Sequence, residues 1–342
     1  MVFSLVRLFR GKTPKIKDDK GEVIPTSIAS LEEITLGGIK QWILIRSHSV
    51  ENPLLLFLHG GPGSAEMGFA HKYERKLEEH FLFVNWDQRG AGKSFSRKIP
   101  KESMNIEQFV SEAHELVLFL MDRFKKKKIV LVGHSWGSAL GVLLVQRYPE
   151  LFSAFVSIGQ LTNLIDNEKV SLQFTLDEAK KRGNKKAVKQ LLKLQPPYYN
   201  EIQQLNRQRK WMAKFGGAVH NQTSMWPIIK EMLKAPEYTL RDSLGYFQGT
   251  VFTIKSLWVE IIEKIDLVKD ARKFSVPVYF IVGRYDYNTP FELAEQYFKK
   301  IQAPKKEFIW FEKSAHSPNF EEPEKFDEVM IEKVLKEVKL AN

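Results

Sequence analysis

A serine flanked by glycines constrains the fold of this chain more than any other feature. Residues 133–137 read Gly-His-Ser-Trp-Gly, and they directly follow an entirely apolar run at residues 129–132 and open a helical pattern. A serine at such a strand-to-helix turn is typical of a nucleophile elbow, in which a sharp turn holds the hydroxyl above the edge of a sheet. The motif therefore predicts Ser135 as a nucleophile, with an ordinary glycine turn as the alternative.

Strand-like and helix-like segments alternate along most of the chain. Short apolar or alternating runs predict strands at residues 40–46, 53–58, 81–84, 129–132, 154–158, 278–282 and 307–311. Helical periodicity predicts helices at residues 106–124, 138–148, 291–300 and 326–335. This alternation indicates a mainly parallel sheet flanked by helices on both faces. Together with the nucleophile elbow, it predicts the α/β-hydrolase fold.

The alternation stops between residues 161 and 258. Helix-period segments there are broken by Arg182-Gly183-Asn184, Pro196-Pro197 and Gly216-Gly217. We interpret this stretch as a helical cap inserted into the hydrolase core, whose two segments are residues 1–160 and 259–342. Aromatic residues of the cap could line an apolar pocket, although we expect most of them to form the cap's own core: Phe174, Trp211, Phe215 and Trp226.

Composition narrows the classes of function. The 342 residues include no cysteine and carry a formal net charge of +11, so disulfides and thiolate metal sites are excluded and a reducing, cytoplasmic location is expected. No nucleic-acid-binding motif accompanies the basic residues, which we interpret as a solvated surface. No metal or organic cofactor is expected, because His-Glu-x-x-His and similar ligand spacings are absent. Residues 1–10 are expected to be a disordered or docked terminus rather than a membrane-surface anchor.

A serine nucleophile needs a base and an acid, which follow the serine in the order acid and then histidine in this fold. Only His220 and His316 lie beyond Ser135, and His316 follows the last predicted strand, so it is predicted as the base. The acid is predicted to be Asp286, just after the strand at residues 278–282, with Asp166 as the main alternative. Two further aspartates precede that strand and should lie at the wrong edge of the sheet: Asp266 and Asp270.

A second glycine-rich motif, His59-Gly60-Gly61-Pro62-Gly63, follows the strand at residues 53–58. Acyl transfer needs N–H donors aimed at the developing oxyanion, and the backbone N–H groups of Gly61 and Trp136 are predicted to supply them. His59 is expected to be a buried structural residue. In the loop Asp87-Gln88-Arg89-Gly90, we expect Asp87 and Arg89 to brace the oxyanion loop. Its Gly-x-Gly-Lys-Ser continuation lacks the spacing of a phosphate-binding loop.

Taken together, these motifs resemble the proline iminopeptidase family of serine aminopeptidases. The resemblance rests on the glycine-rich loop at residues 59–63, Asp87-Gln88-Arg89-Gly90, Gly-His-Ser-Trp-Gly-Ser at residues 133–138, and Gly283-Arg284-Tyr285-Asp286 followed by Thr289-Pro290. It covers both sheet segments and implies an aminopeptidase that acts on short peptides or small molecules through an acyl-enzyme and releases N-terminal proline or another small apolar residue.

The cap departs from the family pattern. Cap glutamates hold the substrate's free amino group in the family, and one often follows a tryptophan; Trp258-Val259-Glu260 comes nearest to that pair here. Other candidates are Glu168, Glu178, Glu201 and Glu231. A carboxylesterase or lactonase acting on a small apolar ester is the alternative activity, and a non-catalytic binding protein is a third. Epoxide hydrolases and dehalogenases would place an aspartate at position 135.

Overall fold

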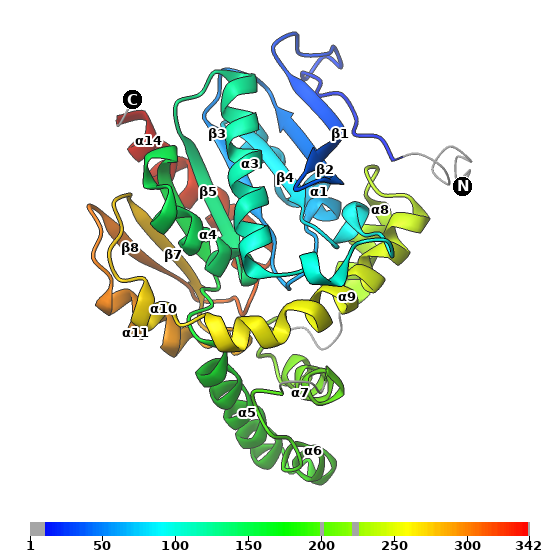
Figure 1. Ribbon diagram of the computed structural model, residues 1–342, viewed down its shortest axis with the longest axis vertical. Coiled ribbons are helices and arrows are strands. Elements are labelled where there is room, and N and C mark those ends of the chain that lie inside the picture. Colours follow the sequence, from blue (N-terminus) through cyan, green and yellow to red (C-terminus); the bar gives the residue numbers. More distant parts are fainter. Residues whose placement is uncertain (1–10, 199–201, 221–225, 341–342) are drawn as a thin grey trace.

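An eight-stranded sheet forms the centre of the molecule (Figure 1). The structure is a computed structural model that describes residues 11–198, 202–220 and 226–340, so the expectation for residues 1–10 lies outside the described residues. The strands are β1 Ile28–Leu36, β2 Ile39–Ser47, β3 Leu54–Leu58, β4 Leu82–Asp87, β5 Ile129–His134, β6 Phe152–Ile158, β7 Val278–Gly283 and β8 Lys306–Phe311.

The strands lie in the order β1-β2-β4-β3-β5-β6-β7-β8. β1 and β2 pair antiparallel, as do β2 and β4, and every following neighbour pair is parallel. The predicted strands are all present within a few residues of their expected bounds, whereas β1 was not predicted. Its side chains are mostly half-buried and include charged residues, as befits an edge strand, so it lacks the apolar run that marks the central strands.

Helices cover both faces of the sheet. One face packs against α3 Ile106–Phe124, α4 Trp136–Arg147, α10 Leu267–Asp270 and α11 Phe291–Lys300. The other packs against α2 Arg75–Glu78, α13 Pro323–Val329, the π-helix η6 Met330–Leu335 and α14 Lys336–Leu340. Side chains of β3 alternate between these two cores, as strand geometry requires. The predicted mainly parallel sheet flanked by helices is confirmed.

Short helical turns complete the core. They are η2 Met67–Phe69, α1 Ala70–Tyr73, η3 Gly92–Ser94, η4 Lys101–Ser103, η5 Pro149–Leu151 and α12 Pro318–Glu321. The long helix α3 begins where the sequence predicts, because the Asn105 side chain accepts the Gln108 N–H at 2.9 Å and satisfies one free donor of the first turn. Its apolar face then packs on the sheet through five turns.

In the described part of the segment between β6 and β7, five helices precede α10: α5 Leu164–Lys181, α6 Lys185–Leu191, α7 Ile202–Lys214, α8 Trp226–Lys234 and α9 Leu240–Lys264. In Figure 1, α9 runs along the lower side of the core, and α5, α6 and α7 project below it. α9 continues six residues past residue 258, where the sequence pattern placed the end of the insertion. Within the ranges that the structure describes, no helix is both long and apolar enough to cross a membrane.

The parallel strands present their carboxyl ends at one edge of the sheet. The loops after β3, β5, β7 and β8 all leave from this edge, and they carry Gly61, Ser135, Asp286 and His316 respectively. In open α/β sheets, ligands bind in the crevice outside these strand ends. The topology therefore gathers residues that lie up to 255 positions apart in the sequence around one site.

Candidate active site

Ser135 occupies a strained backbone position between β5 and α4. Its φ of 55° and ψ of −116° are rare for a residue with a side chain. The surrounding backbone holds it there, because the Ser135 N–H donates to Ile158 O at 2.9 Å and the Ser138 N–H donates to Ser135 O at 2.9 Å. Such conformations persist where neighbouring structure enforces them and are concentrated at functional sites. The predicted elbow turn is therefore present.

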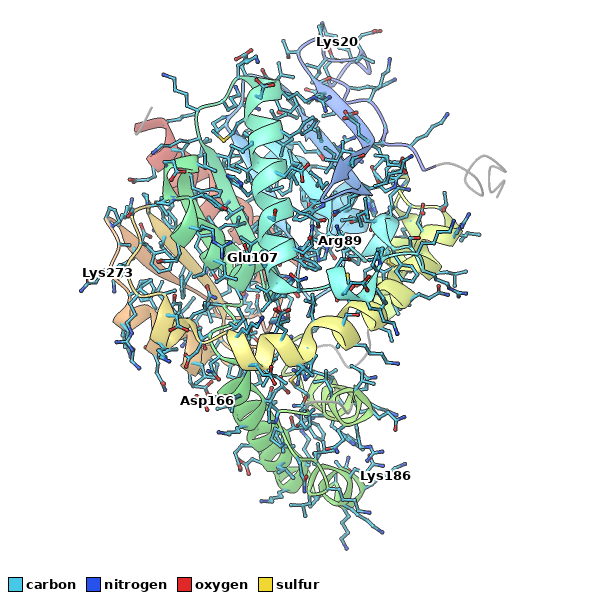
Figure 2. All side chains as sticks on the ribbon, in the orientation of Figure 1. Lys20, Arg89, Glu107, Asp166, Lys186 and Lys273 are labelled. Carbon is cyan, nitrogen blue, oxygen red and sulfur yellow. The ribbon has the colours of Figure 1, made fainter. Side chains whose placement is uncertain are left out.

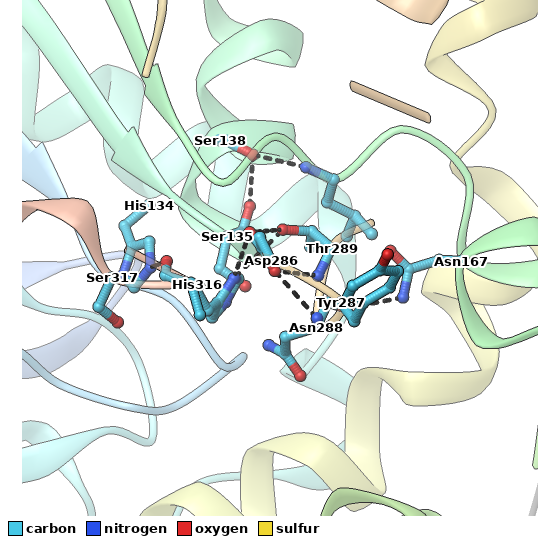
Figure 3. Close-up of polar contacts among 12 residues, drawn as sticks. His134, Ser135, Ser138, Asn167, Asp286, Tyr287, Asn288, Thr289, His316 and Ser317 are labelled. Atoms are coloured by element: carbon cyan, nitrogen blue, oxygen red, sulfur yellow. Dashed lines mark hydrogen bonds and ion pairs between the residues drawn. The ribbon is translucent and has the colours of Figure 1, made fainter. Parts of the chain in front are cut away.

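Asp286 and His316 meet at this sheet edge (Figure 3). His316 Nδ1 lies 3.0 Å from Asp286 Oδ2, which also accepts the Thr289 hydroxyl at 2.9 Å. Asp286 Oδ1 accepts the backbone N–H groups of Asn288 and Thr289, both at 2.9 Å. The Asp286 side chain is fully buried, yet both of its oxygens are supplied with donors. With Nδ1 directed at this carboxylate, Nε2 is the nitrogen of His316 left for proton transfer.

The alternative acids lie elsewhere. Asp166 is in the exposed first turn of α5, where it contacts Lys169 at 3.5 Å, and its side chain is 59% exposed (Figure 2). Asp266 caps α10, and Asp270 is exposed at the end of that helix. The other late histidine, His220, stacks on Tyr285 with ring centroids 3.7 Å apart. Among these residues, the structure thus brings Asp286 to His316.

A small cavity of about 30 Å³ opens beside Ser135. Gly61 and Trp136, the predicted oxyanion donors, both line it. The rest of the lining comes from the segment between β6 and β7 and from the loop after β7: Leu161, Leu164, Asn167, Arg209, Trp258, Ile261, Asn288 and Thr289. Ser135, both predicted oxyanion residues and residues of the inserted segment therefore share one small cavity.

Gln88, rather than Asp87 or Arg89, braces the glycine-rich loop. Its backbone N–H donates to His59 Nε2 at 3.1 Å, and its side chain donates to His59 O at 3.0 Å and accepts from the Trp136 indole at 3.1 Å. His59 is buried as expected, and burial lowers its pKa to about 4, so it stays neutral.

The expectation for Asp87 and Arg89 was wrong. Arg89, which is labelled in Figure 2, forms a buried ion pair with Glu112 of α3. It also donates to Gly37 O. Asp87 accepts the Lys93 N–H and the Tyr238 hydroxyl, and burial raises its pKa to about 7. Because Glu112 and Tyr238 lie far from these residues in the sequence, the local motif does not indicate them as partners.

Comparison with known proteins assigns this fold to a family. Residues 53–323 match the family model described as the alpha/beta hydrolase fold. The chain belongs to the α/β-hydrolase fold family. The hydrolase is 35% identical over 302 residues to the probable aminopeptidase YbaC of Bacillus subtilis, covering 88% of this chain and 94% of that protein.

Proline iminopeptidases are also among the relatives of the hydrolase. The enzyme of Heyndrickxia coagulans is 23% identical over 283 residues, covering 80% of this chain and 87% of that protein. The crystal structure of proline iminopeptidase from Mycobacterium smegmatis superimposes with a TM-score of 0.63 at 17% identity, covering 92% of this chain and all of that chain. These relatives confirm the family resemblance that the motifs indicate.

One glutamate of the hydrolase's inserted helices lies behind the cavity wall. Glu168 on α5 is fully buried and accepts from Arg209 through both guanidinium nitrogens, with Nη1 to Oε2 at 2.9 Å. It also accepts from Asn167 at 3.2 Å. Both donors line the cavity. Phe174, Trp211 and Phe215 stack on other aromatic rings outside this lining, and the Trp226 side chain lies outside the described residues.

The remaining candidate glutamates have partners elsewhere. Glu178 pairs with Arg182 on α5, Glu231 with Lys234 on α8, and Glu260 with Lys264 on α9. Glu201 lies outside the described residues. Among the candidates that the structure describes, Glu168 is therefore the one whose hydrogen-bond partners reach the cavity.

Sequence reasoning missed two side chains close to Ser135. His134 contacts Glu66 through Nδ1 at 2.6 Å and the backbone O of His316 through Nε2 at 2.9 Å. Glu66 follows the glycine-rich loop by three residues, so nothing local in the sequence connects it with His134. The histidine inside the serine motif was the one available signal, because residues at that position lie directly beside the nucleophile.

A larger cavity of about 1030 Å³ lies between the start of α9, the loop after β4 and the strands β1 and β2. Its lining includes Trp42, Lys93 and Arg241 but none of Ser135, Asp286 and His316. Size alone would favour this cavity as the binding site, but Ser135 lines the smaller one. Among the residues that the structure describes, no cluster of three histidine, aspartate or glutamate side chains could hold a metal ion.

Proposed function

We propose that this chain is a serine hydrolase that acts through an acyl-enzyme and releases N-terminal proline or another small apolar residue from short peptides. The contact between His316 Nδ1 and Asp286 Oδ2 at 3.0 Å, at the sheet edge where Ser135 stands in its strained turn, carries the proposal. The similarity to a probable aminopeptidase and to proline iminopeptidases supports the peptidase activity.

In this mechanism Ser135 Oγ attacks the scissile carbonyl while His316 Nε2 takes its proton. Asp286 holds the imidazole in the required tautomer and stabilises the imidazolium that forms. The backbone N–H groups of Gly61 and Trp136, which line the cavity beside Ser135, stabilise the oxyanion. His316 then returns the proton to the leaving amine, and water hydrolyses the acyl-enzyme in a second round of the same steps.

The inserted segment, residues 161–258, serves in this proposal as the cap that selects the substrate. Leu161, Leu164 and Trp258 supply apolar walls for a small side chain. Glu168 is the cap carboxylate that we assign to the substrate's ammonium group, which would compete with Arg209 for its oxygens. A hydrogen bond to a charged group contributes about 1.5–3 kcal/mol, or roughly one to two decades in specificity.

An esterase or lactonase remains the second candidate, and one observation favours it. The charged side chain that lines the cavity is Arg209, a cation, whereas Glu168 lies behind it. A substrate without a free amine would leave the Glu168–Arg209 pair undisturbed. The two candidates share the nucleophile, base and acid, and they differ in the role of Glu168.

The test compares a proline arylamide with its N-acetylated form. The aminopeptidase requires kcat/KM for the free amine to be higher by at least about tenfold, and Glu168→Gln should reduce this ratio by roughly one to two decades. A ratio is the appropriate measure because any loss of folded protein affects both substrates equally. Glu178→Gln, which breaks an ion pair on the same helix, is the matched control and should leave the ratio unchanged.

Equal rates on the two arylamides, or hydrolysis of simple acyl esters alone, would transfer the assignment to the esterase. A normal ratio in Glu168→Gln would retain the aminopeptidase but remove Glu168 from amine recognition.

A further inference from the structure

A buried ion pair between His134 and Glu66 lies next to the proposed nucleophile. His134 immediately precedes Ser135 at the end of β5, and its ring lies beside that of His316, with centroids 4.9 Å apart (Figure 3). Its Nδ1 is 2.6 Å from Glu66 Oε1, and its Nε2 is 2.9 Å from the backbone O of His316. The side chains of His134 and Glu66 are only 8% and 7% exposed, respectively. The proposed mechanism assigns neither of them a role.

The protons of this pair follow from its partners. A carbonyl oxygen only accepts hydrogen bonds, so His134 Nε2 must carry a proton. Nδ1 faces a carboxylate, and one further proton therefore lies between His134 and Glu66. Burial alone would lower the pKa of His134 and raise that of Glu66, but the charge and hydrogen bond of each partner outweigh it. The pKa of His134 is raised and that of Glu66 is lowered, so the pair is imidazolium and carboxylate.

Glu66 connects the pair to two more parts of the site. Its Oε1 accepts the Gly60 N–H at 3.3 Å, and its Oε2 lies 3.5 Å from the Asn319 amide nitrogen in α12, just after His316. Gly60 precedes the oxyanion residue Gly61, and a Cβ atom on Gly60 would stand 3.0 Å from Ser135 Cβ. The pair thus contacts the loop after β3, the serine turn and the loop after β8 at once.

We propose that Glu66 and His134 are positioning residues that hold the His316 loop and the Gly60-Gly61 loop in register with Ser135. The inference rests on the proposed serine mechanism, because it concerns the placement of that mechanism's base and oxyanion donors. The link that matters most is the hydrogen bond from His134 Nε2 to the His316 carbonyl, since it fixes the backbone of the base itself.

The pair should make activity sensitive to alkaline pH. Because the pKa of His134 is raised above that of an ordinary histidine, the imidazolium persists to higher pH than in a free imidazole and is lost as the pH rises through the raised pKa. The proton that remains favours Nδ1, beside the carboxylate, so the bare Nε2 then faces the His316 carbonyl and the two acceptors repel each other. The other titratable groups that act on the pair are His59, His316, Asp286, Tyr246 and Glu74.

Two substitutions of His134 separate positioning from simple packing. The amide nitrogen of His134→Gln falls near the position of Nε2, so it can still donate to the His316 carbonyl, but it cannot titrate. The amide nitrogen of His134→Asn falls near Nδ1, which keeps the contact with Glu66 and loses the link to His316. His114→Asn is the control, since His114 lies in α3 and stacks on Tyr148 at the end of α4.

We expect kcat of His134→Asn to fall roughly 10²-fold with KM little changed, because a small displacement of a catalytic group costs about that much. His134→Gln should keep kcat within a few-fold of the wild type at neutral pH. The pH profile is recorded as the rate of fluorophosphonate labelling, because this probe carries no amine that titrates, and the alkaline decline of the wild-type rate should be absent from His134→Gln. Equal kcat values for His134→Asn and the wild type, or an alkaline decline in labelling that persists in His134→Gln, would overturn the proposal.

A measurement on the unmutated protein does not depend on whether the variants fold. In ¹⁵N-labelled wild type, both ring nitrogens of His134 should be mostly protonated at pH 6.5, the usual pKa of a histidine, and a neutral ring at that pH would overturn the proposal. Fluorophosphonate labelling separates this outcome from failure of the serine mechanism. Labelling that survives Ser135→Ala contradicts the mechanism, whereas equal labelling rates of wild type and His134→Asn contradict only the positioning role.

Discussion

At the scale of single residues, the site depends on side chains whose partners are supplied by the backbone. Ser135 is held in its strained turn by Ile158 O and the Ser138 N–H, and Asp286 by the N–H groups of Asn288 and Thr289. A fully buried carboxylate is costly unless such donors surround it. The donors around Asp286 therefore offset this cost and fix its direction towards His316.

Replacing this carboxylate separates the two candidate acids. Asp286→Asn should lower kcat by roughly 10⁴-fold, because an amide no longer selects the tautomer of His316 with a free Nε2. Asp166→Asn, which alters an exposed contact with Lys169, should leave kcat near that of the wild type. Steady-state kinetics on the better arylamide measures both, and a reversed order of the two losses would make Asp166 the acid.

At the scale of elements, the serine turn requires α4 to approach β3 very closely. A Cβ atom on Gly137 would lie 2.0 Å from Leu58 O and 2.8 Å from His59 O, both of them backbone atoms that cannot move aside alone. The glycines on either side of the serine indicate this contact in the sequence, because only their small size permits it. The sharp turn and the close packing both require glycine at these positions, so the motif predicts both features.

Adding one methyl group at two glycines should change stability in opposite directions. Gly137→Ala should destabilise the protein by about 1–3 kcal/mol or more through overpacking and should displace Ser135. Gly245→Ala lies inside α9, where its Cβ would meet Gly92 O at an ordinary 3.4 Å, and should stabilise by about 0.5–1 kcal/mol. Urea unfolding monitored by tryptophan fluorescence checks both. A neutral Gly137→Ala would refute the close approach.

At the scale of the whole molecule, the central strands and the helices on both faces could be predicted because their apolar patterns are local. The edge strand β1 could not, since half-buried charged side chains give it no such pattern. The predicted role of Asp87 and Arg89 in the loop after β4 was wrong for a different reason. Arg89 and Asp87 select partners on α3 and near α9 that are set by the fold, and Glu66 meets His134 across 68 positions of sequence.

The cavity beside Ser135 also joins two parts of the molecule. Leu161, Leu164 and Trp258 of the inserted segment line it together with Gly61 and Trp136 from the sheet edge. The sequence could not predict which residues of the inserted segment line the cavity, because that depends on how its helices pack on the sheet.

The central claim is that Ser135 is the nucleophile, and covalent labelling tests it most directly. A fluorophosphonate should add once per chain, and mass spectrometry of the digested protein should place the adduct on the peptide that contains Ser135. Ser135→Ala should take up no label and should lose turnover by a factor on the order of 10⁶. An adduct on another residue, or labelling that persists in Ser135→Ala, would contradict the account.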